Sequence, residues 1–79
     1  MNWLTLRELD EAENLPKGSA FRAFKALRAQ LVEDRDFRLL EAQRDAVEIA
    51  ALGARIYASS RNVLLFSPQT SALVRGKMR

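Results

Sequence analysis

The chain contains neither cysteine nor histidine. Without cysteine it forms no disulfides and has no thiolate nucleophile or cysteine-ligated zinc or iron–sulfur centre. Without histidine it has no Ser-His-Asp triad, no imidazole metal ligand and no side chain whose ordinary pKa suits a general base near neutral pH. We therefore expect no enzymatic activity, no bound metal and no cofactor.

Long apolar segments are also missing. The longest wholly aliphatic or aromatic run, Val63 to Phe66, is far shorter than the roughly 20 residues that a transmembrane helix needs. No signal-peptide pattern is visible at the N-terminus. The sequence thus predicts a cytoplasmic protein with no membrane partner.

The chain is short, with 79 residues, of which 48% are hydrophobic and 29% are charged. This balance is typical of a folded globular protein and not of a disordered one. We expect residues 1–79 to form one domain that buries only roughly 60% of the surface its unfolded form exposes. A homodimer is one way in which so small a core would be supplemented.

Acidic residues are absent from two regions, residues 16–32 and all positions after Glu48, although the net charge is only +3. Basic residues occupy both regions: Lys17, Arg22, Lys25 and Arg28 in the first, and Arg55, Arg61, Arg75, Lys77 and Arg79 in the second. If the two regions share one face of the folded chain, they form the electrostatic footprint of a polyanion-binding surface.

Local capping signals mark the first helix. Thr5 is followed three residues later by Glu8, the spacing of a capping box, and Leu4 and Leu9 stand at the positions of a hydrophobic staple. These signals predict a short helix that begins at Leu6.

A second helix is predicted over roughly residues 17–32. Asn14 suits the left-handed backbone that ends the first helix, and Pro16 and Gly18 separate the two helices. One arc of about 120° collects the apolar residues that we expect to be buried, namely Ala20, Phe21, Phe24, Leu27 and Leu31. The opposite arc is basic and otherwise carries short side chains, namely Ser19, Arg22, Lys25, Ala26 and Ala29. Phe21 and Phe24 are therefore predicted to pack in the core rather than to stack on bases.

The middle of the chain permits two interpretations. Residues 33–36 form a polar turn, whose two aspartates supply too few oxygen ligands for a hard cation. Phe37 to Leu40 then form either a short strand or the start of one longer helix, from Phe37 to Leu52, with Asp36 as its cap. Under either interpretation a helix ends before Gly53.

The last third of the chain predicts a β-hairpin and a final helix. Ile56–Ser60 and Val63–Phe66 have the composition of strands, with Arg61 and Asn62 as the turn and Tyr57 pointing outward. Ser67 is expected to cap a final helix, with Pro68 at its first position and Gly76 just past its end. The predicted fold class is α+β, with a helical N-terminal half and a C-terminal hairpin.

The segment LTLRELDEAENLPKGSAFRAFKAL, followed by the expected hairpin, resembles the small winged helix-turn-helix DNA-binding regulators of the phage or excisionase kind. In that family the second helix enters the major groove and the wing contacts phosphate. The resemblance implies a sequence-specific regulator whose partner is double-stranded DNA. It also implies the contact residues: Lys17, Ser19, Arg22 and Lys25 toward the groove, and Arg61 at the wing tip with Arg55 near the other end of the hairpin.

The chain departs from this family at the helix crossing. Asp10 stands where the family has a small residue, so its side chain is expected to be displaced outward. Ala20 and Ala23 stand where the family prefers larger aliphatic residues. The alternative function is a protein-interaction module or homodimeric accessory protein without catalytic activity, in which the apolar arc of the middle helix or the final strand pairs with a partner.

Overall fold

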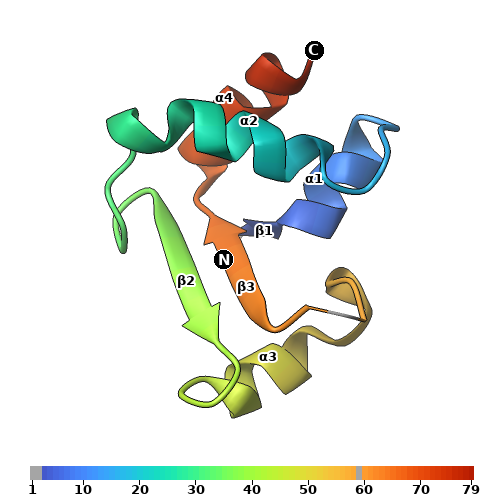
Figure 1. Cartoon of the computed structure of the whole chain (residues 1–79), viewed down its shortest axis with the longest axis vertical. Coiled ribbons are helices and arrows are strands. Elements are labelled where there is room, and N and C mark those ends of the chain that lie inside the picture. Colours follow the sequence, from blue (N-terminus) through green and yellow to red (C-terminus); the bar gives the residue numbers. More distant parts are fainter. Residues whose placement is uncertain (1–2, 59) are drawn as a thin grey trace.

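The computed structural model describes residues 3–58 and 60–79, which form an α+β fold of four α-helices and a three-stranded antiparallel sheet (Figure 1). In chain order the elements are β1 (Leu4–Thr5), α1 (Leu6–Ala12), α2 (Ser19–Leu27), a 3₁₀ turn (Arg28–Gln30), β2 (Phe37–Glu41), α3 (Ala46–Leu52), a second 3₁₀ turn (Gly53–Arg55), β3 (Asn62–Phe66) and α4 (Pro68–Met78).

The sheet has the strand order β1-β3-β2, so β3 is its central strand. Phe66 of β3 pairs with Leu4 on one side and with Phe37 on the other. The apolar run of β3 matches its burial, because alternate residues of a strand point to opposite faces, and Val63 on one face is buried like Leu64 and Phe66 on the other.

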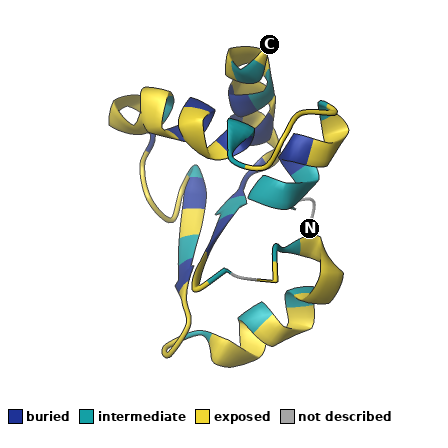
Figure 2. Cartoon of the chain, turned by 45° about the vertical axis from the view of Figure 1, so that its right-hand side comes forward, coloured by how far each residue is buried: buried dark blue, intermediate teal, exposed yellow. Residues whose placement is uncertain are grey.

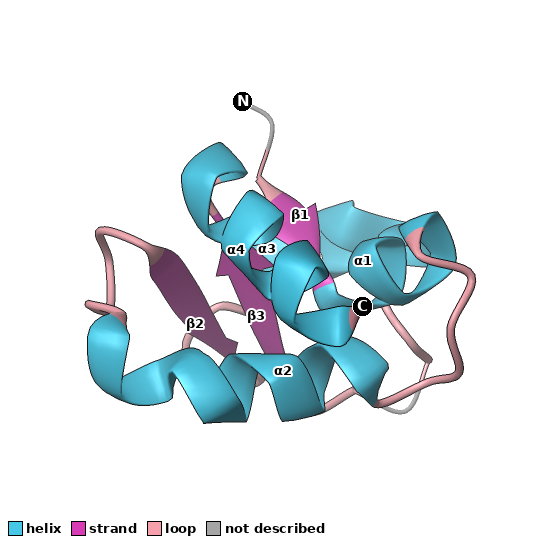
Figure 3. Ribbon diagram, turned by 90° about the horizontal axis from the view of Figure 1, so that it is seen from above, coloured by secondary structure: helices cyan, strands magenta, loops and turns pink. Residues whose placement is uncertain are grey.

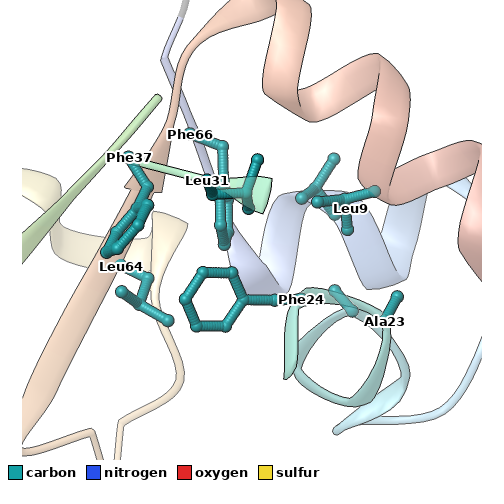
Figure 4. Packing of buried hydrophobic residues seen from close by; sticks show 9 residues of the cluster. Leu9, Ala23, Phe24, Leu31, Phe37, Leu64 and Phe66 are labelled. Carbon is teal, nitrogen blue, oxygen red and sulfur yellow. The ribbon is translucent and has the colours of Figure 1, made fainter. Parts of the chain in front are cut away.

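The core lies where α1, α2 and α4 meet one end of the sheet, as seen from above in Figure 3. Figure 4 shows Phe24 reaching from α2 into this cluster, with its ring centroid 5.0 Å from that of Phe37 and 5.4 Å from that of Phe66. Figure 2 shows that the buried residues gather around these helices and strands. α3 lies at the opposite end of the fold and contains no buried residue.

The predicted helix caps are confirmed at both ends of the chain. The Glu8 N–H donates to Thr5 Oγ1 at 3.1 Å and the Thr5 N–H donates to Glu8 Oε1 at 3.0 Å, which is a complete capping box. Asn14 has a φ of 55° just after α1. Ser67 caps α4 and Pro68 is at its first position.

The predicted end of α4 at Gly76 is wrong, because the helix continues to Met78. A glycine inside a helix costs only about 1 kcal/mol. The last turn is held by Met78, which packs against the core, and by Arg79, whose guanidinium donates to the Glu13 carboxylate at 3.0 Å. These tertiary contacts outweigh the local preference to stop.

The second predicted helix is shorter than expected, since α2 ends at Leu27 and a 3₁₀ turn follows. Ala20 and Phe24 are buried as predicted, but Phe21 is 42% exposed and its predicted place in the core is wrong. Ala23, 5% exposed, is buried instead. The short side chain of Ala23 permits close packing of α4 on α2, so the buried face of α2 consists of Ala20, Ala23 and Phe24 and leaves Phe21 outside.

The middle segment forms a strand and a separate helix, so the alternative of one helix from Phe37 to Leu52 is wrong. Asp36 does not cap a helix. Its carboxylate accepts a hydrogen bond from the Val32 N–H at 2.8 Å and closes the turn before β2. The prediction that a helix ends before Gly53 is confirmed, and Gly53 has a φ of 52°.

The predicted hairpin of residues 56–60 with residues 63–66 is wrong. Residues 56–58 and 60 are not in a strand, and Ser59 lies outside the described residues. β3 pairs with β2 over five residue pairs and with β1, so its two edges are already occupied. Residues 55–57 attach instead to β1 and α1: the Thr5 hydroxyl donates to the Arg55 carbonyl, and Arg7 Nη1 donates to the Ile56 carbonyl at 3.1 Å.

Candidate nucleic-acid interface

The start of α2 is fixed by a buried carboxylate on α1. Asp10 is 1% exposed, and its two oxygens accept hydrogen bonds from the Gly18 N–H at 3.2 Å and the Ala20 N–H at 2.7 Å. The expectation that Asp10 is displaced outward is therefore wrong. A carboxylate at this position satisfies free N–H groups of the first helical turn and interacts favourably with the helix dipole.

Tyr57 binds the same carboxylate from the other side. Its hydroxyl donates to Asp10 Oδ2 at 2.6 Å, and burial together with this hydrogen bond raises the pKa of Tyr57 to about 12. Lys17 Nζ lies 4.9 Å from the centre of the ring. The predicted outward orientation of Tyr57 is wrong, and the residue instead ties the segment before β3 to the junction of α1 and α2.

The outer face of α2 carries the basic residues that the sequence places there. Arg22 and Lys25 are exposed, and Lys25 Nζ lies 5.1 Å from the centre of the Phe21 ring. Ser19 is half-buried at the first turn, where its hydroxyl donates to the Pro16 carbonyl at 2.8 Å. Among the residues that the structure describes, Arg22 makes no ion pair, so its charge is available to a ligand.

Arg55 does not join this face. Its guanidinium donates to both carboxylate oxygens of Glu8, at 2.9 and 3.1 Å, and to the Trp3 carbonyl at 2.7 Å. The hydrogen bonds to Glu8 raise the pKa of Arg55. The charge of Arg55 is thus paired with Glu8, and the side chain holds the second 3₁₀ turn against β1 and α1.

Arg61 is exposed in the bend before β3. It does not sit at the tip of a two-residue hairpin turn, because β3 pairs with β2 and the two strands are joined by residues 42–61, which we call the 42–61 connection. The antiparallel pair that contains β3 is thus formed with β2 and not with residues 56–60.

The three basic residues near the C-terminus have different environments. Arg75 and Arg79 both donate to the carboxylate of Glu13, and these hydrogen bonds, first from Arg79 and then from Arg75, lower the pKa of Glu13 to about 2. Lys77 instead lines a groove between α2 and α4 together with Arg22. Glu13 lies more than 60 positions from its partners, so nothing in the local sequence signals this neutralisation.

No group of three or more acidic side chains in the described part of the chain is arranged to hold a metal ion. Likewise, none of the helices described for residues 3–58 and 60–79 is long and apolar enough to span a bilayer.

Comparisons of this chain with models of protein families, with curated proteins and with solved structures find no match.

Proposed function

We propose that this protein is a sequence-specific regulator that binds double-stranded DNA through α2 and acts by occupying its site, without catalysis. The observation that carries the proposal is the outer face of α2. Arg22 and Lys25 project from it beside the short side chain of Ala26, while the opposite face is packed in the core. A helix with this face fits the major groove of B-DNA, and an arginine there pairs with a guanine edge.

The order of the elements supports a winged helix-turn-helix arrangement. α1 and α2 follow β1 and precede β2, and the antiparallel strands β2 and β3 extend away from α2 toward α3 (Figure 1). The 42–61 connection then takes the place of the wing. In this arrangement Arg61 contacts backbone phosphate, whereas Arg55, already paired with Glu8, serves the fold.

The other predicted residues contact the DNA backbone in this proposal and do not read bases. Lys17 and Ser19 lie at the entrance to α2, where contacts to phosphate set the orientation of the helix, and Lys77 lies across the groove from Arg22. Arg22 and Lys25 then reach the base edges that carry sequence information.

The proposal is tested by fluorescence-anisotropy titration of selected and scrambled duplexes at several salt concentrations. With about four or five phosphate contacts, log K against log salt should have a slope near −4, from roughly −0.9 per phosphate. Arg22→Ala should cost about 1–3 kcal/mol on the selected duplex and much less on the scrambled one. Arg61→Ala should weaken both equally and flatten the slope by about one unit.

Arg35→Ala is the matched control, since Arg35 lies outside α2 and the 42–61 connection and is exposed but already paired with Asp36 at 2.9 Å. It lowers the net charge by the same amount as the other two variants and should leave the slope unchanged. If the wild-type protein shows no salt-dependent binding to any duplex in low salt, the proposed function is wrong.

A second candidate function, self-association as an interaction module, is favoured by α3. Its sequence AVEIAAL contains one charged residue, yet none of its residues is buried and Val47 is 84% exposed. A second copy of the chain is the partner we consider, because helix-turn-helix proteins commonly bind two half-sites as dimers. Sedimentation velocity should show a dimer that Val47→Glu dissociates and Gln43→Glu, outside α3, does not. A monomer at all concentrations would exclude this candidate.

A further inference from the structure

An aromatic side chain stands on the outer face of α2 among cations. Phe21 is 42% exposed and directly precedes Arg22 in the first two turns of the helix. Lys25 Nζ lies over its ring. An exposed apolar ring at this place is not explained by the core, because Ala23 and Phe24 fill the buried face of α2 at these turns.

The ring of Phe21 contacts two neighbours on α2 that restrict its movement. Phe24 stacks against it, with 6.3 Å between ring centroids and 27° between the ring planes, and Phe24 itself is 6% exposed. Lys25 covers it from the side of the helix. Phe21 therefore presents a preorganised apolar surface to a ligand, and little conformational entropy is lost when a ligand contacts it.

The surroundings of the ring suit an apolar group carried by a polyanion. Lys25 lies over the ring, and Phe21 borders a hollow that Leu6, Lys17 and Tyr57 also line, while the exposed Arg22 is the next residue along the helix. In the major groove of DNA the base edges offer hydrogen-bond donors and acceptors and one apolar group, the 5-methyl of thymine.

We propose that Phe21 determines part of the sequence specificity of this protein by contacting the 5-methyl group of a thymine beside the base read by Arg22. This inference rests on the proposed function, since it requires α2 to lie in the major groove. Phe21 then favours T·A or A·T over G·C at one position, through buried apolar area and without a hydrogen bond.

The test uses the duplex with the highest affinity selected from a randomised pool. Each thymine is replaced in turn by deoxyuridine, which lacks only the 5-methyl group, and the dissociation constant is measured by anisotropy. Burial of one methyl group corresponds to about a four-fold change in affinity. For the wild-type protein, one replacement should weaken binding by about this factor.

The same replacement should have no effect on Phe21→Ala or on Phe21→Gln, which keeps a long side chain and good helix propensity. Leu73→Ala is the matched control, because Leu73 is a 56% exposed apolar residue on α4 and its loss should leave the sensitivity to deoxyuridine intact.

The outcomes separate the two proposals. If no duplex binds in a salt-dependent manner, the proposed function fails. If the wild-type protein binds its selected duplex but tolerates deoxyuridine at every position, or if both Phe21 variants keep the full sensitivity, DNA binding stands and the role of Phe21 is refuted. The wild-type measurement alone suffices for refutation, so the test does not depend on either variant remaining folded.

Discussion

The cap that Asp10 provides to α2 is the feature whose loss should affect the fold most clearly. Its buried carboxylate accepts hydrogen bonds from the N–H groups of Gly18 and Ala20 and from the Tyr57 hydroxyl, and Asp10→Ala removes all three hydrogen bonds. Loss of a helix cap costs about 0.5–2 kcal/mol, and the cost rises toward about 3 kcal/mol when the donor left without a partner is buried, as the Ala20 N–H is. Gly18 and Tyr57 are half-buried and can bond to water. We therefore expect a total destabilisation of about 3 kcal/mol.

This loss is large for a chain of 79 residues, whose free energy of unfolding at roughly 0.05–0.15 kcal/mol per residue is about 4–12 kcal/mol. It is measured by urea denaturation, and hydrogen exchange of the Ala20 amide should accelerate in parallel. The control is Glu11→Ala, which removes an exposed acid of the same helix that pairs with the Arg7 guanidinium at 3.1 Å. That change should stay within about 0.5 kcal/mol. If Asp10→Ala destabilises the protein no more than Glu11→Ala does, the carboxylate does not hold α2 and the reasoning is refuted.

Three further changes test the packing and the ion pairs. Thr5→Ala should cost about 2 kcal/mol in urea denaturation, because the buried hydroxyl both caps α1 and donates to the Arg55 carbonyl; an unchanged midpoint would contradict the capping box. Phe24→Ala should cost about 3–5 kcal/mol, enough to unfold much of the population by circular dichroism, whereas Phe21→Ala should leave the fold largely intact; equal effects would place both rings in the core. Hydrogen bonds from Arg79 and Arg75 lower the pKa of Glu13 from 4.5 to about 2, so the stability that this group contributes is present above pH 4.5 and is lost as the pH falls toward 2. The difference in unfolding midpoint between the wild-type protein and Glu13→Gln should shrink over that interval, and a difference independent of pH would refute the assignment.

Local sequence signals were enough to predict the features that neighbouring residues determine. The capping box at Thr5, the left-handed residue Asn14 and the cap at Ser67 each depend on hydrogen bonds or backbone preferences within a few positions. The burial of Phe24 followed from helical periodicity, and the α+β class followed from the mixture of periodic and β-branched segments. In these cases local propensity and tertiary structure favour the same conformation.

The buried face of α2 and the ion-pair partners of the basic residues could not be predicted without the tertiary structure. Helical periodicity predicts burial for Phe21 rather than for Ala23, because the pattern depends on the hydrophobicity of each side chain and not on how closely two helices can pack. The packing of α4 on α2 reverses that order, since a short side chain at Ala23 permits close contact. Charge patterning likewise treated all C-terminal cations alike, although Glu13 pairs with Arg75 and Arg79 and not with Lys77.

The sequence was enough to predict where α1 and α4 begin, which segments are apolar and that catalytic histidine and cysteine are absent. The pairing of β3 with β2 and β1, the inward position of Asp10 and the attachment of residues 55–57 to β1 and α1 became known from the three-dimensional structure. The physical reason is that strand pairing and buried hydrogen bonds join groups far apart in the chain. Ile56–Ser60 has the composition of a strand, but β3 has two edges, and both are taken by strands that pair with it in register.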